Sequence, residues 1–363
     1  MRVVHVVQSL ALGGQEMLIV QLSRELLRRG HEVGVVALSP GGELSGELRA
    51  LGARVNELGR REGFDPRLFG ALGVALGRWR PAVVHTHNAS PLIYGAPVAR
   101  LLGARVVHTK HGVGETSART RLLLRATARL PAAWVCVSEE TAQLAVAREG
   151  APSVRTVVLR NGVDVAAFAP SAARRRAARA LLPVEHDAFV VGTVGRMVPA
   201  KDHATLVEAV ALVPGAHLVL VGDGPERPRV EALARARLPR CVHLLGARRD
   251  VSHLLHAFDV FALSSRTEGV PLALLEAMAA ERAVVATAVG GVPSVLAEVG
   301  ALAPAGNAAA LAAAIDAYRN DGPAREDAGR AARRRVADRY SLSAMTDAYE
   351  ALYRGDPSGA GVA

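Results

Sequence analysis

The chain has 363 residues, of which half are hydrophobic but only 4% aromatic, and 44 basic residues face 34 acidic ones. This length favours two domains over one, and the apolar runs are too short to cross a bilayer. The apolar run at residues 3–7 gives way to Gln8 and Ser9, which is typical of a buried strand rather than a secretory signal. We therefore expect a cytoplasmic protein.

Cysteine content indicates whether disulfides are expected, and net charge indicates the kind of partner. Cys136 and Cys241 are the only cysteines, and each lies in an apolar, strand-like run, so no disulfide framework is expected. The formal net charge of +10 favours an anionic partner such as a phosphate, a nucleic acid or an acidic membrane surface. Charge alone does not choose among these three.

Runs of β-branched residues alternate with amphipathic helical stretches, such as Glu16–Arg29, along the first half of the chain. This alternation predicts an α/β fold, with a parallel sheet covered by helices on both faces. The first half therefore forms one doubly wound domain. Its strands are expected at Val3–Val7, Glu32–Ala37, Arg54–Glu57, Val83–Thr86, Arg105–Thr109, Trp134–Val137 and Arg155–Leu159.

Strand-like runs resume after a stretch rich in Ala and Arg, so a second doubly wound domain follows. We expect an N-terminal domain at 1–165, a linker at 166–187, a C-terminal domain at 188–340 and a last helix at about 341–355 that packs back on the first domain. Ligands of such folds bind outside the carboxyl ends of the strands, which predicts a site in a cleft between two facing domains. The second set of strands is expected at Phe189–Thr193, His217–Val221, Val242–Leu245, Val260–Leu263 and Ala283–Thr287.

Glycine turns and cations at strand ends are candidate phosphate sites. Gly13 and Gly14 precede a helix, where backbone amides can face an anion with no Cβ in the way, although a bare tight turn explains the spacing equally well. Gly195, Arg196 and Lys201 follow the first strand of the second domain. Arg196 can neutralise a diphosphate through a planar fork and Lys201 as a point charge, with a solvated loop as the alternative.

The next strand end carries another glycine turn, at Gly222 and Gly224, followed by Pro225. The glycines permit a tight turn, and Pro225 suits the first position of a helix. A purely structural role explains this turn as well as phosphate binding does.

Two carboxylates lie after the strand expected at Val260–Leu263. Glu268 precedes an apolar helix whose start Pro271 marks, and Glu276 lies inside that helix. Taken separately, a helix cap at Glu268 and a hydrogen-bonded structural glutamate at Glu276 are the simpler explanations.

The two glutamates, separated by seven residues and accompanied by Gly269 and Ala277, resemble the paired-glutamate motif of glycosyltransferase family 4. This family contains retaining enzymes of the GT-B fold. Other strings that resemble family motifs occur in family order, namely Gly13-Gly14, His111-Gly112, Val137-Ser138-Glu139, Asn161-Gly162-Val163-Asp164, Val194-Gly195-Arg196, Lys201-Asp202, Val221-Gly222-Asp223-Gly224 and Gly290-Gly291-Val292-Pro293.

The resemblance implies a role for each side chain of the candidate site. Arg196 and Lys201 would hold the diphosphate of a nucleotide sugar. Glu276 would hydrogen-bond the ribose, and Glu268 would contact hydroxyls of the transferred sugar. His111 matches a family histidine near the sugar and the acceptor, with a satisfied loop histidine as the alternative. The expected catalytic residues are therefore His111, Arg196, Lys201 and Glu268.

Backbone groups form the other part of the implied donor site. Amides near Gly269 and Val270 would meet the sugar or the phosphate. The family often has Phe-Gly after Glu-Gly, where this chain has Val270-Pro271, and Pro271 contributes no amide donor. The glycines expected to line the donor site are Gly14, Gly195 and Gly222.

The implied reaction is glycosyl transfer with retention at the anomeric carbon, assisted by electrostatic stabilisation of the departing diphosphate. No cofactor and no metal are expected, because the sequence contains no Asp-x-Asp pair and its histidines lack the spacing of zinc sites. A sugar-nucleotide epimerase of similar architecture is the alternative enzyme. Many family members build bacterial surface polysaccharides on lipid carriers, which makes a lipid-linked acceptor one candidate.

The positive charge raises two further kinds of partner, nucleic acid and membrane. A nucleic-acid-binding module is not expected, because the arginines are spread over many helices and few aromatic residues interleave with them. The stretch Arg119–Leu130 is basic and amphipathic, so it is a candidate for peripheral contact with an anionic membrane. A solvated helix face is the alternative explanation of that stretch.

Overall fold

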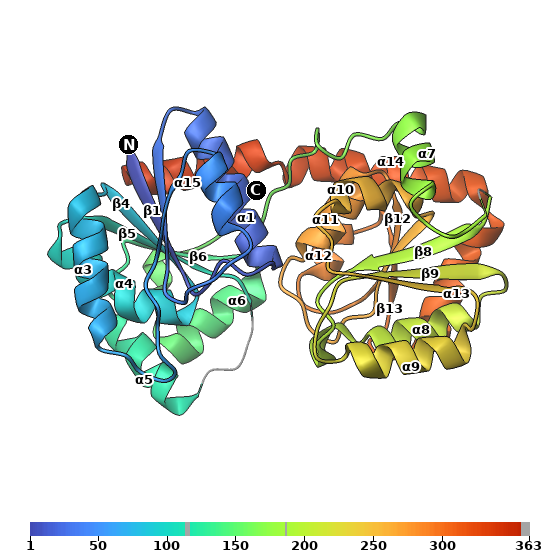
Figure 1. The fold of residues 1–363 in the computed structure, drawn as a ribbon, viewed down its shortest axis with the longest axis horizontal. Coiled ribbons are helices and arrows are strands. Elements are labelled where there is room, and N and C mark those ends of the chain that lie inside the picture. The colour runs from blue at the N-terminus through green and yellow to red at the C-terminus, as the bar shows by residue number, and fades with distance from the viewer. Residues whose placement is uncertain (113–116, 186, 357–363) are drawn as a thin grey trace. The chain divides into compact units, whose positions relative to one another are not determined.

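The fold is that of a computed structural model, which describes residues 1–112, 117–185 and 187–356. The chain divides into two compact units, Met1–Gly162 with Leu342–Ala363, and Val163–Ser341. Each unit is built on a parallel sheet with helices on both of its faces (Figure 1). The predicted α/β class with two doubly wound domains is confirmed. The segment expected as a linker, 166–187, is part of the second unit and contains helix α7 (Ala172–Arg179).

The sheet of the first unit has seven strands in the order β3-β2-β1-β4-β5-β6-β7, and all neighbouring strands are parallel. The order reverses between β1 and β4, where His5 lies opposite His85. The strands are β1 (Arg2–Val7), β2 (Glu32–Ala37), β3 (Arg54–Glu57), β4 (Val83–His87), β5 (Arg105–Lys110), β6 (Ala133–Cys136) and β7 (Thr156–Val158). The described helices before residue 162 are α1 (Gly14–Arg28), α2 (Ser45–Ala50), α3 (Arg67–Trp79), α4 (Ala89–Leu101), α5 (Ala118–Thr127) and α6 (Glu139–Leu144).

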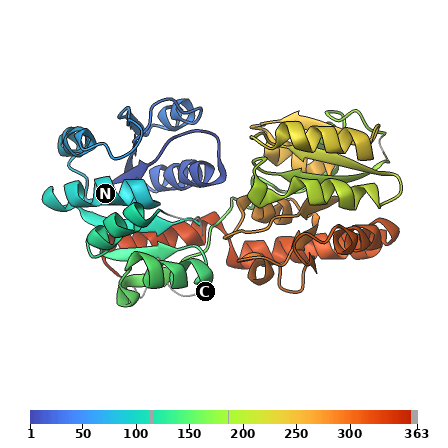
Figure 2. The same ribbon diagram turned by 90° about the horizontal axis from the view of Figure 1, so that it is seen from below.

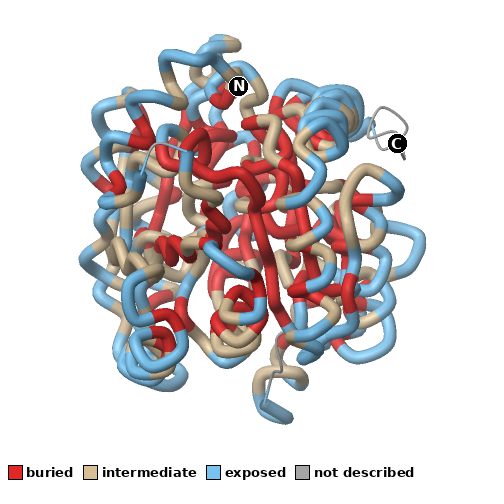
Figure 3. Tube along the Cα trace, turned by 90° about the vertical axis from the view of Figure 1, so that its right-hand side faces the viewer, coloured by how far each residue is buried: buried red, intermediate tan, exposed pale blue. Residues whose placement is uncertain are grey.

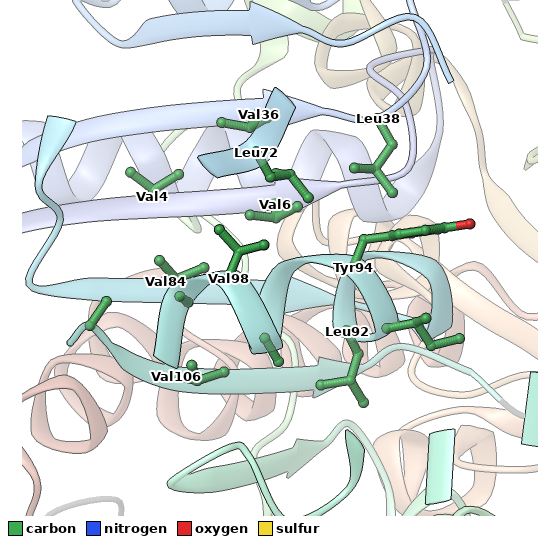
Figure 4. Packing of buried hydrophobic residues seen from close by; sticks show 14 of the residues in the cluster. Val4, Val6, Val36, Leu38, Leu72, Val84, Leu92, Tyr94, Val98 and Val106 are labelled. Atoms are coloured by element: carbon green, nitrogen blue, oxygen red, sulfur yellow. The ribbon is translucent and has the colours of Figure 1, made fainter. Parts of the chain in front are cut away.

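One face of this sheet packs against α3, α4 and α5. Alternate residues of a strand point to the same face, so Val4 and Val6 of β1 meet Leu72 of α3 and Val98 of α4 in one buried cluster. Figure 4 shows these side chains between the strands and the helices, together with Tyr94 of α4. Strands buried on both faces need continuous apolar sequence, which explains why their positions could be predicted.

The opposite face is covered by α1 and by the last described helix, α15 (Leu342–Arg354). Tyr349 and Tyr353 of α15 are buried there. Polar contacts fasten the helix, since Arg29 donates to Asp347 at 2.5 Å and His31 shares a hydrogen bond with Glu350 at 2.9 Å. Helix α15 is therefore an integral layer of the first unit.

The second unit contains a six-stranded sheet in the order β10-β9-β8-β11-β12-β13, again parallel throughout. Helices α8, α9 and α13 cover one face, and α7, α11 and α14 cover the other, so each sheet is a middle layer (Figures 1 and 2). The strands are β8 (Phe189–Val194), β9 (Ala216–Val221), β10 (Val242–Gly246), β11 (Val260–Leu263), β12 (Ala283–Thr287) and β13 (Ala301–Ala303). The remaining helices are α8 (His203–Ala211), α9 (Arg227–Arg237), α10 (Val251–Leu254), α11 (Leu272–Ala279), α12 (Val292–Leu296), α13 (Ala308–Asn320) and α14 (Gly322–Arg339).

Burial follows these layers, because the central strands are buried and the outward sides of the helices are exposed (Figure 3). The sequence did not predict strand β13, which has three residues, Ala301–Ala303, and no β-branched side chain. Among the described residues, no helix has the length and apolar character that a membrane span requires.

Candidate active site

Most of the candidate side chains of the second unit gather where its strand order reverses, between β8 and β11. These two strands are neighbours, and they are followed by the loops 195–202 and 264–271. Ligands of open α/β sheets bind at the carboxyl ends of strands where the order reverses. The fold therefore puts the loop that carries Arg196 and Lys201 beside the loop that carries Glu268.

Lys201 and Glu268 form an ion pair between these loops. The Nζ atom of Lys201 donates to Oε1 of Glu268 at 2.5 Å, and Oγ of Ser265 donates to the same oxygen at 2.6 Å. The Glu268 side chain is 8% exposed and that of Lys201 is 25% exposed. A carboxylate so far removed from water needs such partners. The sequence predicted both charged residues but not their contact.

A second set of polar contacts holds the two loops together. Ser264 donates from its Oγ to the carbonyl oxygens of Lys201 at 3.1 Å and of Asp202 at 2.9 Å. Arg266 donates from Nε to the carboxylate of Asp202 at 2.9 Å. Sequence reasoning assigned no role to Ser264 or Arg266. Their only sequence signal is a pair of serines directly after a buried strand.

Gly195 and Arg196 directly follow β8. The Arg196 side chain is exposed and has no hydrogen-bond partner among the described residues. A Cβ added to Gly195 would meet nothing closer than the Cδ and Cε atoms of Lys201, each at 4.0 Å. Packing therefore does not explain Gly195, whereas a ligand that approaches Lys201 across its backbone would.

Gly222 and Gly291 have structural explanations instead. A Cβ at Gly222, where φ is +141°, would collide with the carbonyl oxygen of Gly195. A Cβ at Gly291 would collide with the carbonyl oxygen of Gly269, which accepts a hydrogen bond from the Gly291 amide at 3.1 Å. These glycines let neighbouring loops approach each other. Val270, expected to offer an amide to the donor, is buried beside this contact.

Glu276 lies on α11, which begins at Leu272 directly after Pro271. Its carboxyl group is half-buried and has no hydrogen-bond partner among the described residues. Burial raises its pKa to about 7, because a desolvated carboxylate without a partner is unfavourable. A structural glutamate would hold a partner here. The carboxyl is thus available to accept hydrogen bonds from a ligand.

In the first unit, Asn88 connects two loops at the point where the strand order reverses. Asn88 follows β4 with a φ of 63°. Its Nδ2 donates to the side chain of Gln15 at 2.5 Å, and its Oδ1 accepts from the amide of His111 at 2.9 Å. Gln15 follows Gly14, the exposed first residue of α1, whose N-cap Gly13 makes no side-chain cap. The structure thus brings Gly14 and His111 to the same edge of the first sheet.

His111 directly follows β5 and is half-buried. Its Nε2 shares a hydrogen bond with Nδ1 of His87 at 2.9 Å. Burial lowers the pKa of His111 to about 3, so its imidazole is neutral near pH 7.

Three other histidines of the first unit meet inside the fold. His5, His85 and His87 are buried, and a possible ligand atom of each lies within 4.8 Å of the others. Neutral imidazoles so arranged can bind a metal ion. The sequence did not predict this cluster, because its members come from β1 and β4 and meet only through the register of the sheet.

The basic stretch Arg119–Leu130 is largely helical, as α5. Leu124 points into the core and is 1% exposed, whereas Leu122 is 69% exposed. Arg119 and Arg125 are exposed as well. The outer surface of α5 therefore combines positive charge with an apolar side chain.

Comparison with known proteins identifies the family. Residues 12–167 match the family described as "Glycosyltransferase Family 4", and residues 188–321 match the family described as "Glycosyl transferases group 1". The Escherichia coli UDP-Gal:alpha-D-GlcNAc-diphosphoundecaprenol alpha-1,3-galactosyltransferase is 33% identical over 215 residues, which are 54% of each chain. The D-inositol 3-phosphate glycosyltransferase of Mycobacterium bovis is 31% identical over 309 residues, 79% of this chain and 60% of that one.

Among solved structures, Anabaena Alr3699/HepE in complex with UDP-glucose superposes with a TM-score of 0.85 at 22% identity, covering 98% of this chain and 100% of the other. The crystal structure of WaaG, a glycosyltransferase involved in lipopolysaccharide biosynthesis, superposes with a TM-score of 0.77 at 18% identity, covering 98% and 100%. The two sheets are those of the GT-B fold. The chain belongs to glycosyltransferase family 4, as the motifs in its sequence predicted. It spans 54% and 60% of the length of the two curated relatives named above.

We predict that Glu276→Gln stabilises the protein at pH 8 but not at pH 5. The pKa of Glu276 is about 7 in the folded protein against an ordinary 4.5, so the folded state holds this proton more tightly. Stability therefore falls as the pH rises from about 4.5 to 7. The amide removes this cost, which we expect to be about 1–3 kcal/mol, measured by urea unfolding at both pH values.

The matched control is Glu298→Gln, which replaces an exposed carboxylate of the same unit. We expect the control to change stability equally at pH 5 and pH 8. An equal effect of Glu276→Gln at both pH values would contradict the raised pKa.

Proposed function

We propose that this protein is a retaining glycosyltransferase that transfers a sugar from a nucleotide diphosphate sugar to an acceptor. The ion pair between Lys201 and Glu268 carries this proposal. An ammonium group and a carboxylate 2.5 Å apart match two adjacent parts of such a donor, the phosphate and the sugar hydroxyls.

The remaining groups of the second unit fit the same donor. Arg196 supplies a second cation without an internal partner among the described residues, and a planar guanidinium suits phosphate oxygens. Gly195 leaves room for the diphosphate beside Lys201. Glu276 accepts hydrogen bonds from the ribose hydroxyls, which supply the donors that its carboxyl lacks within the described chain.

The chemical step then depends mainly on charge. The bond between the anomeric carbon and the phosphate breaks, the acceptor oxygen bonds to the anomeric carbon, and the acceptor proton passes to the departing diphosphate. Arg196 and Lys201 stabilise the negative charge that develops on this diphosphate. The donor site works without a metal ion or a cofactor, because two cations already neutralise the leaving group. We assign no protein nucleophile. His111 contacts the sugar and the acceptor, as the family resemblance implies.

Named relatives support the choice of substrates. The Escherichia coli relative is named for UDP-Gal and for an acceptor attached to diphosphoundecaprenol, and the Anabaena protein has been solved with UDP-glucose. We therefore propose a UDP-sugar donor and a lipid-linked acceptor, in the synthesis of a bacterial polysaccharide or glycolipid.

Donor binding tests the site. In a titration panel of UDP-, GDP-, ADP- and TDP-sugars, we expect Lys201→Ala and Glu276→Ala each to weaken binding of the best donor. Loss of one hydrogen bond to a charged group costs about 1.5–3 kcal/mol, which corresponds to roughly 10- to 150-fold.

Arg229→Ala is the control, since Arg229 is an exposed arginine of α9 that pairs with Glu226. We expect it to leave donor affinity unchanged. If neither Lys201→Ala nor Glu276→Ala weakens binding of the best donor, the site assignment is wrong.

The rate at which nucleoside diphosphate is released distinguishes a transferase from an epimerase. We expect lipid-linked acceptors to accelerate release of the nucleoside diphosphate at least ten-fold, and EDTA to leave the rate unchanged. An epimerase would instead convert the donor sugar without any acceptor. Chromatography of the nucleotide products distinguishes the two, and donor conversion in the absence of acceptor would refute the transferase.

We also propose that the protein is cytoplasmic and contacts anionic membrane through α5. Exposed arginines attract acidic headgroups, and Leu122 can enter the interface. We expect Leu122→Glu to reduce co-sedimentation with vesicles that contain phosphatidylglycerol at least five-fold. Leu212→Glu, at a leucine of the second unit that is 61% exposed, is the matched control. Binding that is independent of anionic lipid would exclude this contact.

A further inference from the structure

Three histidines of the first unit form a continuous hydrogen-bonded row that ends at the candidate site. Nδ1 of His5 shares a hydrogen bond with Nε2 of His87 at 3.0 Å. Nδ1 of His87 shares one with Nε2 of His111 at 2.9 Å. We call His5, His87 and His111 the histidine row. It runs from the interior of the sheet to the half-buried residue that directly follows β5.

All members of the histidine row are neutral near pH 7. Burial lowers the pKa of His5 and of His111 to about 3, and it lowers that of His87 well below its ordinary value. The titratable groups around the row are His85, Tyr349 and Tyr353 on one face of the sheet, His108, and Lys110, whose Nζ is held by Glu149 at 2.6 Å.

A neutral imidazole carries one N–H donor and one lone pair, so each bond of the row fixes the direction of the next. In one arrangement the protons lie on Nε2 of all three rings, and His111 donates to His87. In the other they lie on Nδ1 of all three rings, and His5 donates to His87, which donates to His111. The two arrangements therefore differ in whether the ring nitrogen at each end of the row carries a proton.

The buried end decides between the two arrangements. Nε2 of His5 is buried and has no hydrogen-bond partner among the described residues. The first arrangement would leave an N–H group unpaired there, whereas the second leaves only a lone pair. Unpaired buried N–H groups are the rarer case in proteins. Placing the protons on Nδ1 avoids this unpaired N–H group and makes the outer atom of His111 an N–H.

We propose that His87, supported by His5, is a positioning residue that fixes His111 in the Nδ1–H tautomer, so that His111 donates a hydrogen bond to a substrate oxygen and does not act as a general base. The oxygen is a hydroxyl or phosphate oxygen of the nucleotide sugar or its acceptor. This role rests on the proposed function, because it assumes that His111 meets the substrate. Asn88 assists by binding the backbone amide of His111 at 2.9 Å.

His85 lies outside the row although its ring is 4.1 Å from that of His87. Its Nδ1 shares a hydrogen bond with the hydroxyl of Tyr353 and its Nε2 with that of Thr109, both at 2.7 Å. A metal ion bound by His5, His85 and His87 would have to break at least one of these bonds. The ion would also break a bond of the histidine row, because both ring nitrogens of His87 are engaged there. Metal binding and an intact histidine row therefore exclude each other.

The tautomer can be measured directly by ¹⁵N NMR of the full-length protein with labelled histidine at pH 7. Protonated and unprotonated ring nitrogens resonate far apart, and the His111 signals are those lost in His111→Asn. We expect Nδ1 of His111 to be protonated and Nε2 to be unprotonated. The opposite pattern in the unmodified protein would overturn the proposal.

Variants test the part that His87 plays. We expect His87→Leu to move the His111 proton toward Nε2, the nitrogen that histidine prefers in water. The matched control is His108→Gln, which replaces another buried histidine of the same unit that binds Thr86 outside the row. It should leave the His111 signals unchanged. A His111 tautomer that is unaffected by His87→Leu would show that His87 does not position it.

Kinetics and metal titration complete the test. Asparagine can present an N–H close to the position of Nδ1, so we expect kcat/KM of His111→Asn to exceed that of His111→Asp at least ten-fold. Stoichiometric binding of Zn²⁺ that shifts the signals of His5 and His87 would overturn the row. Absence of any transferase activity would refute the proposed function but leave the NMR result intact.

Discussion

The reversal of strand order in each sheet is the constraint on which the candidate site residues of both units depend. Right-handed crossovers on either side of a central strand send the following helices to opposite faces of the sheet. The loops after β1 and β4, and those after β8 and β11, therefore lie side by side at the ends of these strands and lead to helices on opposite faces of the sheet. The candidate site residues collect at these strand ends, Asn88 and His111 in one unit and Lys201 and Glu268 in the other.

Two carboxyl groups of the second unit differ because their surroundings differ. Glu268 receives hydrogen bonds from Lys201 and Ser265. Glu276, on the following helix, receives none in the described chain, and its pKa rises to about 7. Neighbouring acids in environments that differ so strongly commonly have different roles. In the proposed donor site, Glu268 is held in place before the ligand arrives, and Glu276 gains its partners from the ligand.

The sequence predicted the sheets better than the contacts of the site. Strands buried on both faces leave continuous β-branched runs, so Glu32–Ala37 and Val260–Leu263 were located to the residue, whereas Ala301–Ala303 carries no such signal. The order of the motifs predicted Lys201 and Glu268. Their ion pair, however, depends on how two loops that are 67 residues apart in the sequence pack against each other. The histidine row depends on sheet register, which no local pattern of residues reveals. The ligand roles of all these residues stay predictions.

Helix α15 follows the second unit in the sequence, and this affects how the first unit folds during synthesis. The first unit consists of residues 1–162 together with α15, and the whole second unit is encoded between them. Tyr349 and Tyr353 supply hydroxyl partners to Thr109 and His85 beneath that helix. During synthesis from the N-terminus, the first sheet must therefore wait with one face incompletely covered while about half of the protein is still being translated.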